Sequence, residues 1–193
     1  MTLSRIFKDH CLFLGRFLRN PVSIGSLVPS STFLAKAMAE SVVQSLSTDD
    51  YVLEVGAGTG SLTHALLQYG VAPERLICLE NDPNLVKILK ERFKDLSIVT
   101  GNVCFLREIL PYLEKKVGAV VSGLPLRNFS MLVKEKIVKD SFFLMKEKGL
   151  FYQFTYGYTS PLKGFDLREK KFGFVWRNFP PASLWCYGRQ DRE

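Results

Sequence analysis

Short apolar runs and longer amphipathic stretches alternate along the chain from residue 50 onward. Runs rich in aliphatic and β-branched residues predict strands, whereas apolar positions at helical spacing predict helices. The expected strands cover residues 51–55, 75–80, 96–100, 117–122, 149–156, 171–178 and 183–189. The expected helices cover residues 61–69, 83–93, 104–116 and 131–146, with Asp82-Pro83 as a helix start and Lys148-Gly149 as a helix end. This alternation predicts a doubly wound α/β sheet.

The last two expected strands differ from the others because no helical stretch separates them. Phe179-Pro180-Pro181 joins them, which favours an antiparallel hairpin at one edge of the sheet. A chain of 193 residues, 47% of them hydrophobic, supports one full core and no separate second domain. We therefore expect a single domain over residues 1–193, with a mostly parallel seven-stranded sheet and extra N-terminal helices over residues 1–48.

The N-terminal region has a helical pattern of its own. Residues 3–19 place aliphatic and aromatic side chains on one side of a predicted helix and cations on the other. The cationic side holds Arg5, Lys8, Arg16 and Arg19, and the apolar side holds Leu3, Ile6, Phe7, Phe13, Leu14, Phe17 and Leu18. Such a helix either lies in a membrane interface or packs its apolar side on the domain. A second helix over residues 32–46, capped by Ser30 or Ser31, is expected to cover the sheet.

The net charge of the chain restricts the classes of partner that we expect, and its cysteines and histidines restrict the classes of site that we expect. The net charge is +7 and the pI is about 9.3, so we expect a phosphate-rich partner, either nucleic acid or an anionic membrane. No apolar run reaches the roughly 18 residues of a spanning helix, and no secretory signal is evident. The four cysteines are scattered and only two histidines are present, so we expect neither a metal site nor a histidine-based triad. These features predict a reduced, cytoplasmic protein.

A glycine-rich turn follows the first expected strand. The segment from Val52 to Gly60 reads V-L-E-V-G-A-G-T-G, and a helical pattern begins at Ser61. Glycine allows a tight turn and a close approach of a ligand to the main chain, and N–H groups at the helix start point toward that ligand. Serine at position 61 replaces the third glycine of the dinucleotide fingerprint, and no phosphate-binding G-x-x-x-x-G-K-[ST] loop is present. The spacing resembles motif I of the class I methyltransferases that use S-adenosyl-L-methionine (AdoMet).

Polar residues at the ends of the next two strands fit the same pocket. Glu80 ends the second strand, where a carboxylate can accept hydrogen bonds from both hydroxyls of a ribose. Asn102 follows the third strand, where the resemblance implies contact with adenine. Alternatively, Glu80 is a solvated strand end and Asn102 a plain turn residue. The expected binding residues for AdoMet, and for its product S-adenosyl-L-homocysteine, are Glu54, Gly56, Ala57, Gly58, Gly60, Glu80, Asn81, Asn102, Val103 and Ser122.

The loop after the fourth expected strand bears on the methyl acceptor. Methyltransferases that act on the amino groups of bases commonly carry N-P-P-Y or N-L-P-Y at this point. Here residues 120–129 read V-V-S-G-L-P-L-R-N-F, which puts Gly123 in place of the asparagine and Leu126 in place of the aromatic residue. Both the polar hydrogen-bond acceptor and the stacking ring are therefore missing, which disfavours a flipped base as substrate.

Four segments resemble the bacterial phospholipid N-methyltransferases of the soluble, AdoMet-dependent type. They are residues 25–31 (G-S-L-V-P-S-S), 122–129 (S-G-L-P-L-R-N-F), 154–161 (F-T-Y-G-Y-T-S-P) and 178–182 (N-F-P-P-A). The resemblance implies a class I methyltransferase fold and stepwise methylation of phosphatidylethanolamine toward phosphatidylcholine. It also implies peripheral binding at the inner face of the membrane by a monomer that uses no metal and does not bind nucleic acid. The membrane-binding residues would be Arg5, Phe7, Lys8, Leu14, Arg16, Phe17 and Arg19.

Methylation of an amine needs the neutral amine, because an ammonium group with a pKa of about 10.4 has no free electron pair. No histidine base is evident, so we expect proton loss to water, aided by a tyrosine hydroxyl and by carbonyls of the acceptor loop. The candidate catalytic residues are Ser122, Gly123, Leu124, Pro125, Tyr156 and Tyr158, and Arg127 is a candidate partner of the lipid phosphate. Two alternatives stay open at this point. One is a relative of the rRNA adenine dimethyltransferases, and the other is a non-catalytic AdoMet-binding membrane protein.

Overall fold

The structure is a computed structural model that describes residues 32–178 and 180–190. Its first described element is helix α2 (Thr32–Gln44). The expected amphipathic helix over residues 3–19, its membrane-binding side chains and the Ser30 or Ser31 cap lie outside the described residues. Within the described ranges, no helix is both long and apolar enough to cross a bilayer.

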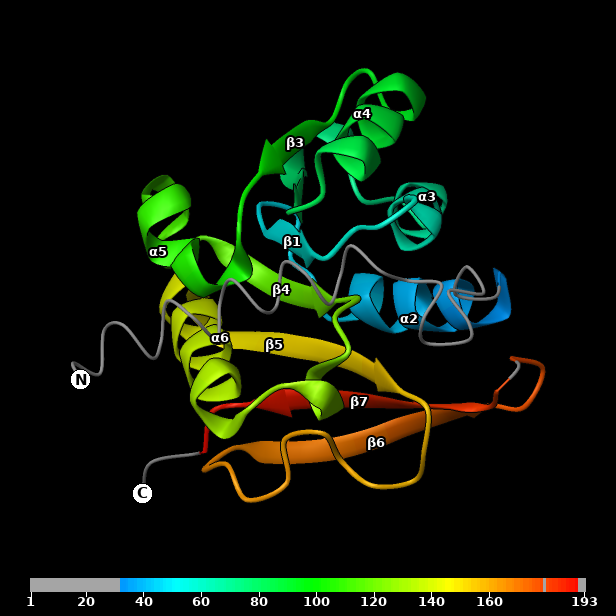
Figure 1. Ribbon diagram of the computed structural model, residues 1–193, viewed down its shortest axis with the longest axis vertical. Helices are drawn as coiled ribbons and strands as arrows, with labels where there is room; N and C mark the ends of the chain where they lie inside the picture. The colour runs from blue at the N-terminus through cyan, green and yellow to red at the C-terminus, as the bar shows by residue number, and fades with distance from the viewer. Residues whose placement is uncertain (1–31, 179, 191–193) are drawn as a thin grey trace.

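Seven strands form one sheet in the order β3-β2-β1-β4-β5-β7-β6 (Figure 1). The first five strands are parallel, and β7 pairs antiparallel with both β5 and β6. The predicted fold, a mostly parallel sheet with an antiparallel edge hairpin, is confirmed. Strand order reverses beside β1, which is where α/β proteins bind ligands. The strands are β1 (Tyr51–Val55), β2 (Leu76–Glu80), β3 (Ser97–Thr100), β4 (Val117–Ser122), β5 (Met145–Thr155), β6 (Arg168–Val175) and β7 (Ala182–Gly188).

Helices cover both faces of the sheet and create two cores (Figure 1). Helices α2, α3 (Ser61–Gln68) and α4 (Pro83–Arg92) lie on one face, and α5 (Leu106–Ile109) and α6 (Met131–Leu144) lie on the other. Successive side chains of a strand alternate between faces, so the neighbours Ala119 and Val120 belong to different cores. Helix α2 is fixed to the sheet by the Tyr152 hydroxyl, which lies 2.9 Å from the Ser45 hydroxyl.

The predicted helix start at Asp82-Pro83 is confirmed, whereas the predicted helix end at Lys148-Gly149 is wrong, because α6 already ends at Leu144. Helix α4 begins as expected, because the Asp82 carboxylate accepts hydrogen bonds from the next two available backbone N–H groups and Pro83 occupies the first turn. The prediction of one helix over residues 104–116 is wrong. The chain instead forms a 3₁₀ turn (Val103–Phe105), the short α5 and a second 3₁₀ turn (Pro111–Leu113). Proline at position 111 removes a backbone donor and disfavours helical geometry in the residue before it, which ends α5.

Two strands begin several residues before the expected position, whereas the limits of the other strands agree to within one residue. Strand β5 begins at Met145 and not near residue 149, and a register shift between Val117 and Ala119 accommodates its longer start. Strand β6 covers Arg168–Val175, three residues earlier than the apolar pattern predicts. Its first residues are charged and exposed, as is usual for an edge strand, and their polarity hides the start of the strand.

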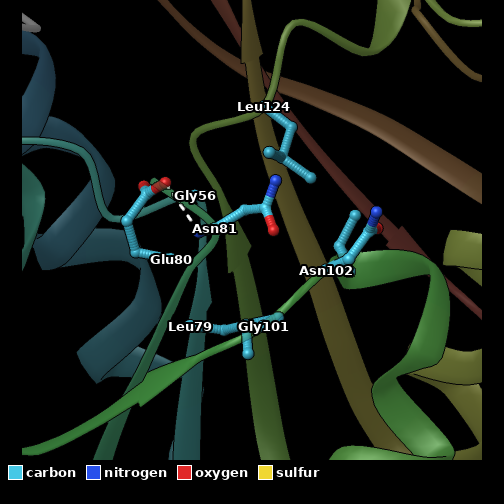
Figure 2. Close-up of a pocket in the computed structure, with 8 residues that line it drawn as sticks. Gly56, Leu79, Glu80, Asn81, Gly101, Asn102 and Leu124 are labelled. Carbon is cyan, nitrogen blue, oxygen red and sulfur yellow. Dashed lines mark hydrogen bonds between the residues drawn. The ribbon is translucent and has the colours of Figure 1, made fainter. Parts of the chain in front are cut away.

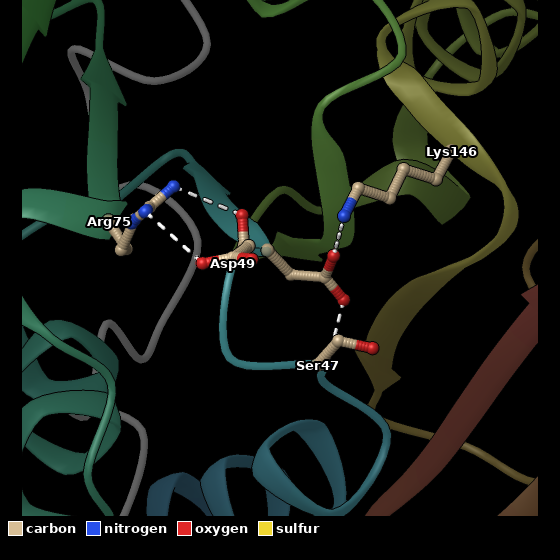
Figure 3. Close-up of polar contacts among 5 residues, drawn as sticks. Ser47, Asp49, Arg75 and Lys146 are labelled. Carbon is tan, nitrogen blue, oxygen red and sulfur yellow. Dashed lines mark hydrogen bonds and ion pairs between the residues drawn. The ribbon is translucent and has the colours of Figure 1, made fainter.

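A polar clamp fixes the amino-terminal edge of the sheet, opposite the ligand edge (Figure 3). Asp50 is buried and accepts a hydrogen bond of 2.9 Å from the backbone N–H of Ser47, while its other oxygen pairs with Lys146. A Cβ at Gly118 would lie 2.4 Å from this carboxylate, so glycine is needed there. The adjacent pair of Arg75 and Asp49 is more exposed, with 3.6 Å between its charged atoms. The clamp joins β1 to the start of β5.

Candidate cofactor and acceptor site

A hollow lies at the carboxyl edge of the sheet, where β1, β2, β3 and β4 end (Figure 2). Parallel strands direct their terminal loops to the same edge, so residues far apart in the sequence meet here. We call this space the cofactor hollow; it is lined by Gly56, Leu79, Glu80, Asn81, Gly101, Asn102, Val103 and Leu124. Five of the predicted cofactor-binding residues are in this set: Gly56, Glu80, Asn81, Asn102 and Val103.

The three glycines of the turn after β1 are required for different structural reasons. All adopt positive φ, at 73°, 58° and 83° for Gly56, Gly58 and Gly60. A Cβ at Gly56 would lie 2.6 Å from Leu124, and one at Gly60 would lie 2.5 Å from the ring of Phe93. A Cβ at Gly58 would meet no atom within 4 Å. Gly56 and Gly60 therefore permit close packing, whereas the open space at Gly58 leaves the main chain accessible to a ligand.

Glu80 organises the glycine-rich loop from the end of β2. Its buried carboxylate accepts hydrogen bonds from the backbone N–H groups of Gly58, Asn81 and Asp82, at 2.9, 2.7 and 2.9 Å. An ionised carboxylate offers about four acceptor positions, so one remains for a ribose hydroxyl. Glu80 is therefore a buried, hydrogen-bonded residue in the wall of the cofactor hollow and not a solvated strand end.

Glu54 lies beside the cofactor hollow and does not line it. Its carboxylate is 1% exposed, accepts a hydrogen bond of 2.7 Å from the Thr63 hydroxyl of α3 and contacts the Cys78 thiol of β2 at 3.4 Å. Burial raises the pKa of Glu54 to about 7, and the nearby charge of Glu80 adds to the rise. Burial likewise raises the pKa of the Cys78 thiol, which stays protonated. Glu54 therefore joins β1 to α3, and its direct contact with a cofactor stays a prediction.

The other predicted cofactor residues lie around the hollow at differing depths. The amide of Asn81 projects into the space between Glu80 and Asn102 (Figure 2). The Asn102 side chain accepts a hydrogen bond of 2.9 Å from the backbone N–H of Cys104, so it also caps the 3₁₀ turn that follows. Ala57 is buried in the core beneath the loop. The chain thus provides a backbone cradle, a carboxylate and two amides, which fits the methionine, ribose and adenine parts of AdoMet.

The acceptor loop packs tightly against the glycine-rich loop. Gly123 donates to the Val55 carbonyl at 2.9 Å, and a Cβ at this position would lie 2.5 Å from the Gly56 carbonyl oxygen. A side chain such as the asparagine of the base-modifying enzymes therefore has no room at this position. Leu126 is 1% exposed and belongs to the core, so its position cannot present a stacking ring to a ligand. Pro125 precedes the 3₁₀ turn (Leu126–Asn128) that carries the chain away from the hollow.

A buried glutamine beside the acceptor loop has no counterpart among the predicted site residues. Gln153 pairs in register with Ser122, and its amide nitrogen donates to the carbonyl oxygens of Leu124 and Phe154 at 3.0 and 2.6 Å. Carbonyl oxygens only accept, so these bonds fix the orientation of the amide. Its own oxygen is buried and has no partner among the described residues. The available signal is one amide within the otherwise apolar run L-F-Y-Q-F, because buried polar groups need partners.

The two candidate tyrosines lie beyond the end of β5. Tyr156 packs edge-on against Phe154 with ring centroids 5.8 Å apart, and burial raises the pKa of its hydroxyl. Tyr158 is 69% exposed and stacks on Phe174 of β6. Arg127 of the acceptor loop donates to the Thr159 hydroxyl at 3.0 Å and so joins the two loops. Neither tyrosine lines the cofactor hollow, and their catalytic role stays a prediction. In the described part of the chain, no cluster of three metal-ligating side chains is present.

Comparisons with known proteins agree with this geometry. A family described as a methyltransferase domain matches residues 52–149. The ornithine lipid N-methyltransferase of Singulisphaera acidiphila is 33% identical to this chain, over 95% of this chain and 98% of that protein. A ribosomal RNA small subunit methyltransferase A of Mesomycoplasma hyopneumoniae is 33% identical over 47% of this chain and only 33% of its own length.

A solved structure shows the same fold. The 1,6-didemethyltoxoflavin-N1-methyltransferase of Burkholderia thailandensis, solved with S-adenosylhomocysteine, has a TM-score of 0.70 at 12% identity and covers 98% of this chain and 92% of its own. This likeness concerns the fold, whereas the sequence match above extends along almost the whole chain. The chain therefore belongs to the class I AdoMet-dependent methyltransferases, in the family that includes the ornithine lipid N-methyltransferase, and AdoMet is its methyl donor.

Proposed function

We propose that this protein transfers the AdoMet methyl group to the amino head group of a membrane lipid, at the membrane surface. Phosphatidylethanolamine and its methylated derivatives are the acceptors that we favour, in a sequence of steps toward phosphatidylcholine. The observation that carries the proposal is the full-length similarity to a lipid N-methyltransferase. The amine of an ornithine lipid is the second candidate acceptor, because that relative is named for it.

The acceptor amine would approach the hollow from the side of the loop that follows β4. The Leu124 carbonyl there already accepts from the Gln153 amide and from the backbone N–H of Leu126. Two other groups would accept a hydrogen bond from the amine: the Gln153 oxygen, which has no partner among the described residues, and the carbonyl of Gly123. Such acceptors orient an amine without a charged base. AdoMet, when bound, would supply an activated methyl group on its sulfonium. The ammonium would first lose a proton to water, and the neutral amine would then take the methyl group as the C–S bond breaks, which conserves charge and atoms.

The packing of the acceptor loop supports a lipid amine over a nucleic-acid base. A base amino group needs a stacking ring and a side-chain acceptor in fixed positions. The site has no room for a side chain at Gly123, and Leu126 is committed to the core. The ribosomal RNA relatives also match only part of the chain and a third of their own length. The glycine cradle and the arrangement around Glu80 support catalysis over a disused AdoMet fold.

The proposal is tested by incubating the full chain with labelled AdoMet and separating the lipids by thin-layer chromatography. The parallel samples contain phosphatidylethanolamine vesicles, ornithine-lipid vesicles and ribosomal RNA. We expect label in the first lipid, and label only in the second would move the proposal to the ornithine lipid. Label in RNA alone would refute it. Gln153→Met, which keeps the side-chain volume, should lower kcat for the lipid while AdoMet affinity changes by less than about twofold.

A further inference from the structure

An exposed aromatic cluster with cations beside it lies where β6 ends. Trp176 is 73% exposed and Tyr158 is 69% exposed, and both contact the ring of Phe174, at 4.6 and 5.3 Å between centroids. The Lys171 ammonium lies 4.9 Å from the centre of the Phe174 ring. We call Tyr158, Lys171, Phe174, Trp176 and the adjacent Arg177 the hairpin patch. Large aromatic side chains held together in water indicate a contact surface for a partner.

The hairpin patch shares the sheet edge that carries the cofactor hollow. Strands β5 and β6 both pair antiparallel with β7, so they run in the same direction and end at the same edge (Figure 1). Because β5 is also parallel to β4 and β1, this is the edge at which the glycine-rich and acceptor loops lie. The hydrogen bond from Arg127 to Thr159 connects the acceptor loop to the segment that holds Tyr158. A flat partner that meets the patch would therefore lie close to the opening of the site.

The charge around the patch identifies the partner chemistry. Between Tyr156 and Arg177 the chain has five basic and two acidic residues, a net charge of +3. Arg177 lies 5.3 Å from the ring centre of Phe33, which is 50% exposed on α2. Tryptophan and tyrosine with adjacent cations are typical of the interface between water and lipid, where rings lie at head-group level and cations reach the phosphates.

We propose that the hairpin patch docks on an anionic phospholipid bilayer and thereby turns the cofactor hollow toward the lipid head groups. Trp176 would lie at the depth of the head groups, with Lys171 and Arg177 among the phosphates. This inference rests on the proposed function, since only a membrane acceptor needs the site to face a bilayer. It concerns described residues of the β6–β7 hairpin and is separate from the prediction for residues 3–19.

Tryptophan fluorescence gives a direct test, because the chain has two tryptophans and Trp185 is 9% exposed. In the full-length Trp185→Phe variant, Trp176 is the sole emitter. Vesicles rich in phosphatidylglycerol should shift its emission to shorter wavelength, and brominated lipids should quench it. The matched control is Tyr112→Trp in a chain that lacks both Trp176 and Trp185. Tyr112 is 53% exposed and lies before the start of β4, at the opposite edge of the sheet. The control should show neither change.

A binding measurement completes the test. Trp176→Ala should weaken sedimentation with anionic vesicles roughly tenfold, the effect expected from losing one large apolar contact. Its activity on phosphatidylethanolamine dispersed in detergent should equal that of the unchanged chain. Unchanged Trp176 emission on vesicles that sediment the protein would overturn the docking inference, as would an emission shift that depends on protein concentration alone, which indicates self-association. A vesicle-induced shift of the Trp176 emission with no lipid methylation would sustain the docking surface and refute the proposed function instead.

Discussion

The replacement Glu54→Gln should make the protein more stable at alkaline pH, although it replaces an acidic residue of the methyltransferase motif. Burial raises the pKa of this carboxyl from 4.5 to about 7. The folded state therefore binds a proton that the unfolded state releases between these values. The stability that the neutral carboxyl contributes is complete below pH 4.5 and is lost as the pH rises through 7. With about 1.4 kcal/mol for each pKa unit, the loss is about 3 kcal/mol.

Glutamine cannot ionise, so the variant avoids this loss. Its oxygen can still accept from Thr63, which is 2.7 Å from the carboxylate, but its amide protons replace the contact with Cys78. At pH 5 we expect the variant to be equal to the unchanged protein or less stable by about 1 kcal/mol. Above pH 7.5 it should be more stable by roughly 2 kcal/mol, because the stability of the unchanged protein relative to the variant falls by about 2.5 kcal/mol between pH 5 and this value.

Urea unfolding at fixed ionic strength between pH 5 and 8 measures this difference. The free energy of unfolding of the unchanged protein minus that of Glu54→Gln should fall steadily as the pH rises. The exposed Glu74 provides the matched control, Glu74→Gln, for loss of one surface carboxylate. A difference for Glu54→Gln that is constant with pH would refute the reasoning. A carboxylate that lowers stability at neutral pH is typical of a functional position, since packing alone gives no reason to retain it.

Three further replacements test the loops and the clamp. Glu80→Ala should lower AdoMet affinity in calorimetry roughly a hundredfold or more, because a charged acceptor is removed; unchanged affinity would exclude the pocket assignment. Gly123→Ala should weaken AdoMet binding, because its Cβ meets a carbonyl oxygen of the glycine-rich loop at 2.5 Å. The control Gly70→Ala is strained by a φ of 102° but has open space around it, so it should lose only about 1 kcal/mol of stability and bind AdoMet normally. Asp50→Asn should lower the free energy of unfolding by about 1–2 kcal/mol. The exposed Asp49→Asn should change it by less than about 0.5 kcal/mol, and equal effects would show that the clamp contributes nothing specific.

The centre of the parallel part of the fold is predictable from the sequence, because β1, β2 and β4 are buried on both sides and are therefore continuous apolar runs. Strand β2 is such a case, with all five residues buried. The start of the edge strand β6 is not predictable in this way, since its first residues are charged and exposed to solvent. The broken helix after Asn102 was foreseeable from Pro111, whose ring forbids an uninterrupted helix. Helical periodicity alone does not include this constraint.

The cofactor half of the site is more predictable than the acceptor half. Glycines with positive φ and a carboxylate at a strand end are local features, and the structure brings Gly56 and Glu80 to one hollow. The direction of a side chain near a strand end is not local. Glu54 faces α3 because alternation along β1 places it on the same face as Cys78 and Val121, and no motif states this. Gln153 becomes a site residue only because β5 lies beside β4, which is a property of the sheet order.

The close contact of two backbones at Gly123 supports the proposed lipid amine over a base as methyl acceptor. A Cβ added at Gly123 of the acceptor loop would lie 2.5 Å from the carbonyl oxygen of Gly56 in the glycine-rich loop. Any side chain there would push apart the two loops that enclose the cofactor, so side-chain recognition at this position and the present packing exclude each other. In the proposed reaction the polar groups left for the acceptor are the Gly123 carbonyl and the buried Gln153 oxygen, which would contact a small amine but offer no surface on which a ring stacks. An amine held by so few contacts would need others elsewhere, and under the proposed docking the exposed aromatic and cationic residues at the same edge would provide them through the membrane.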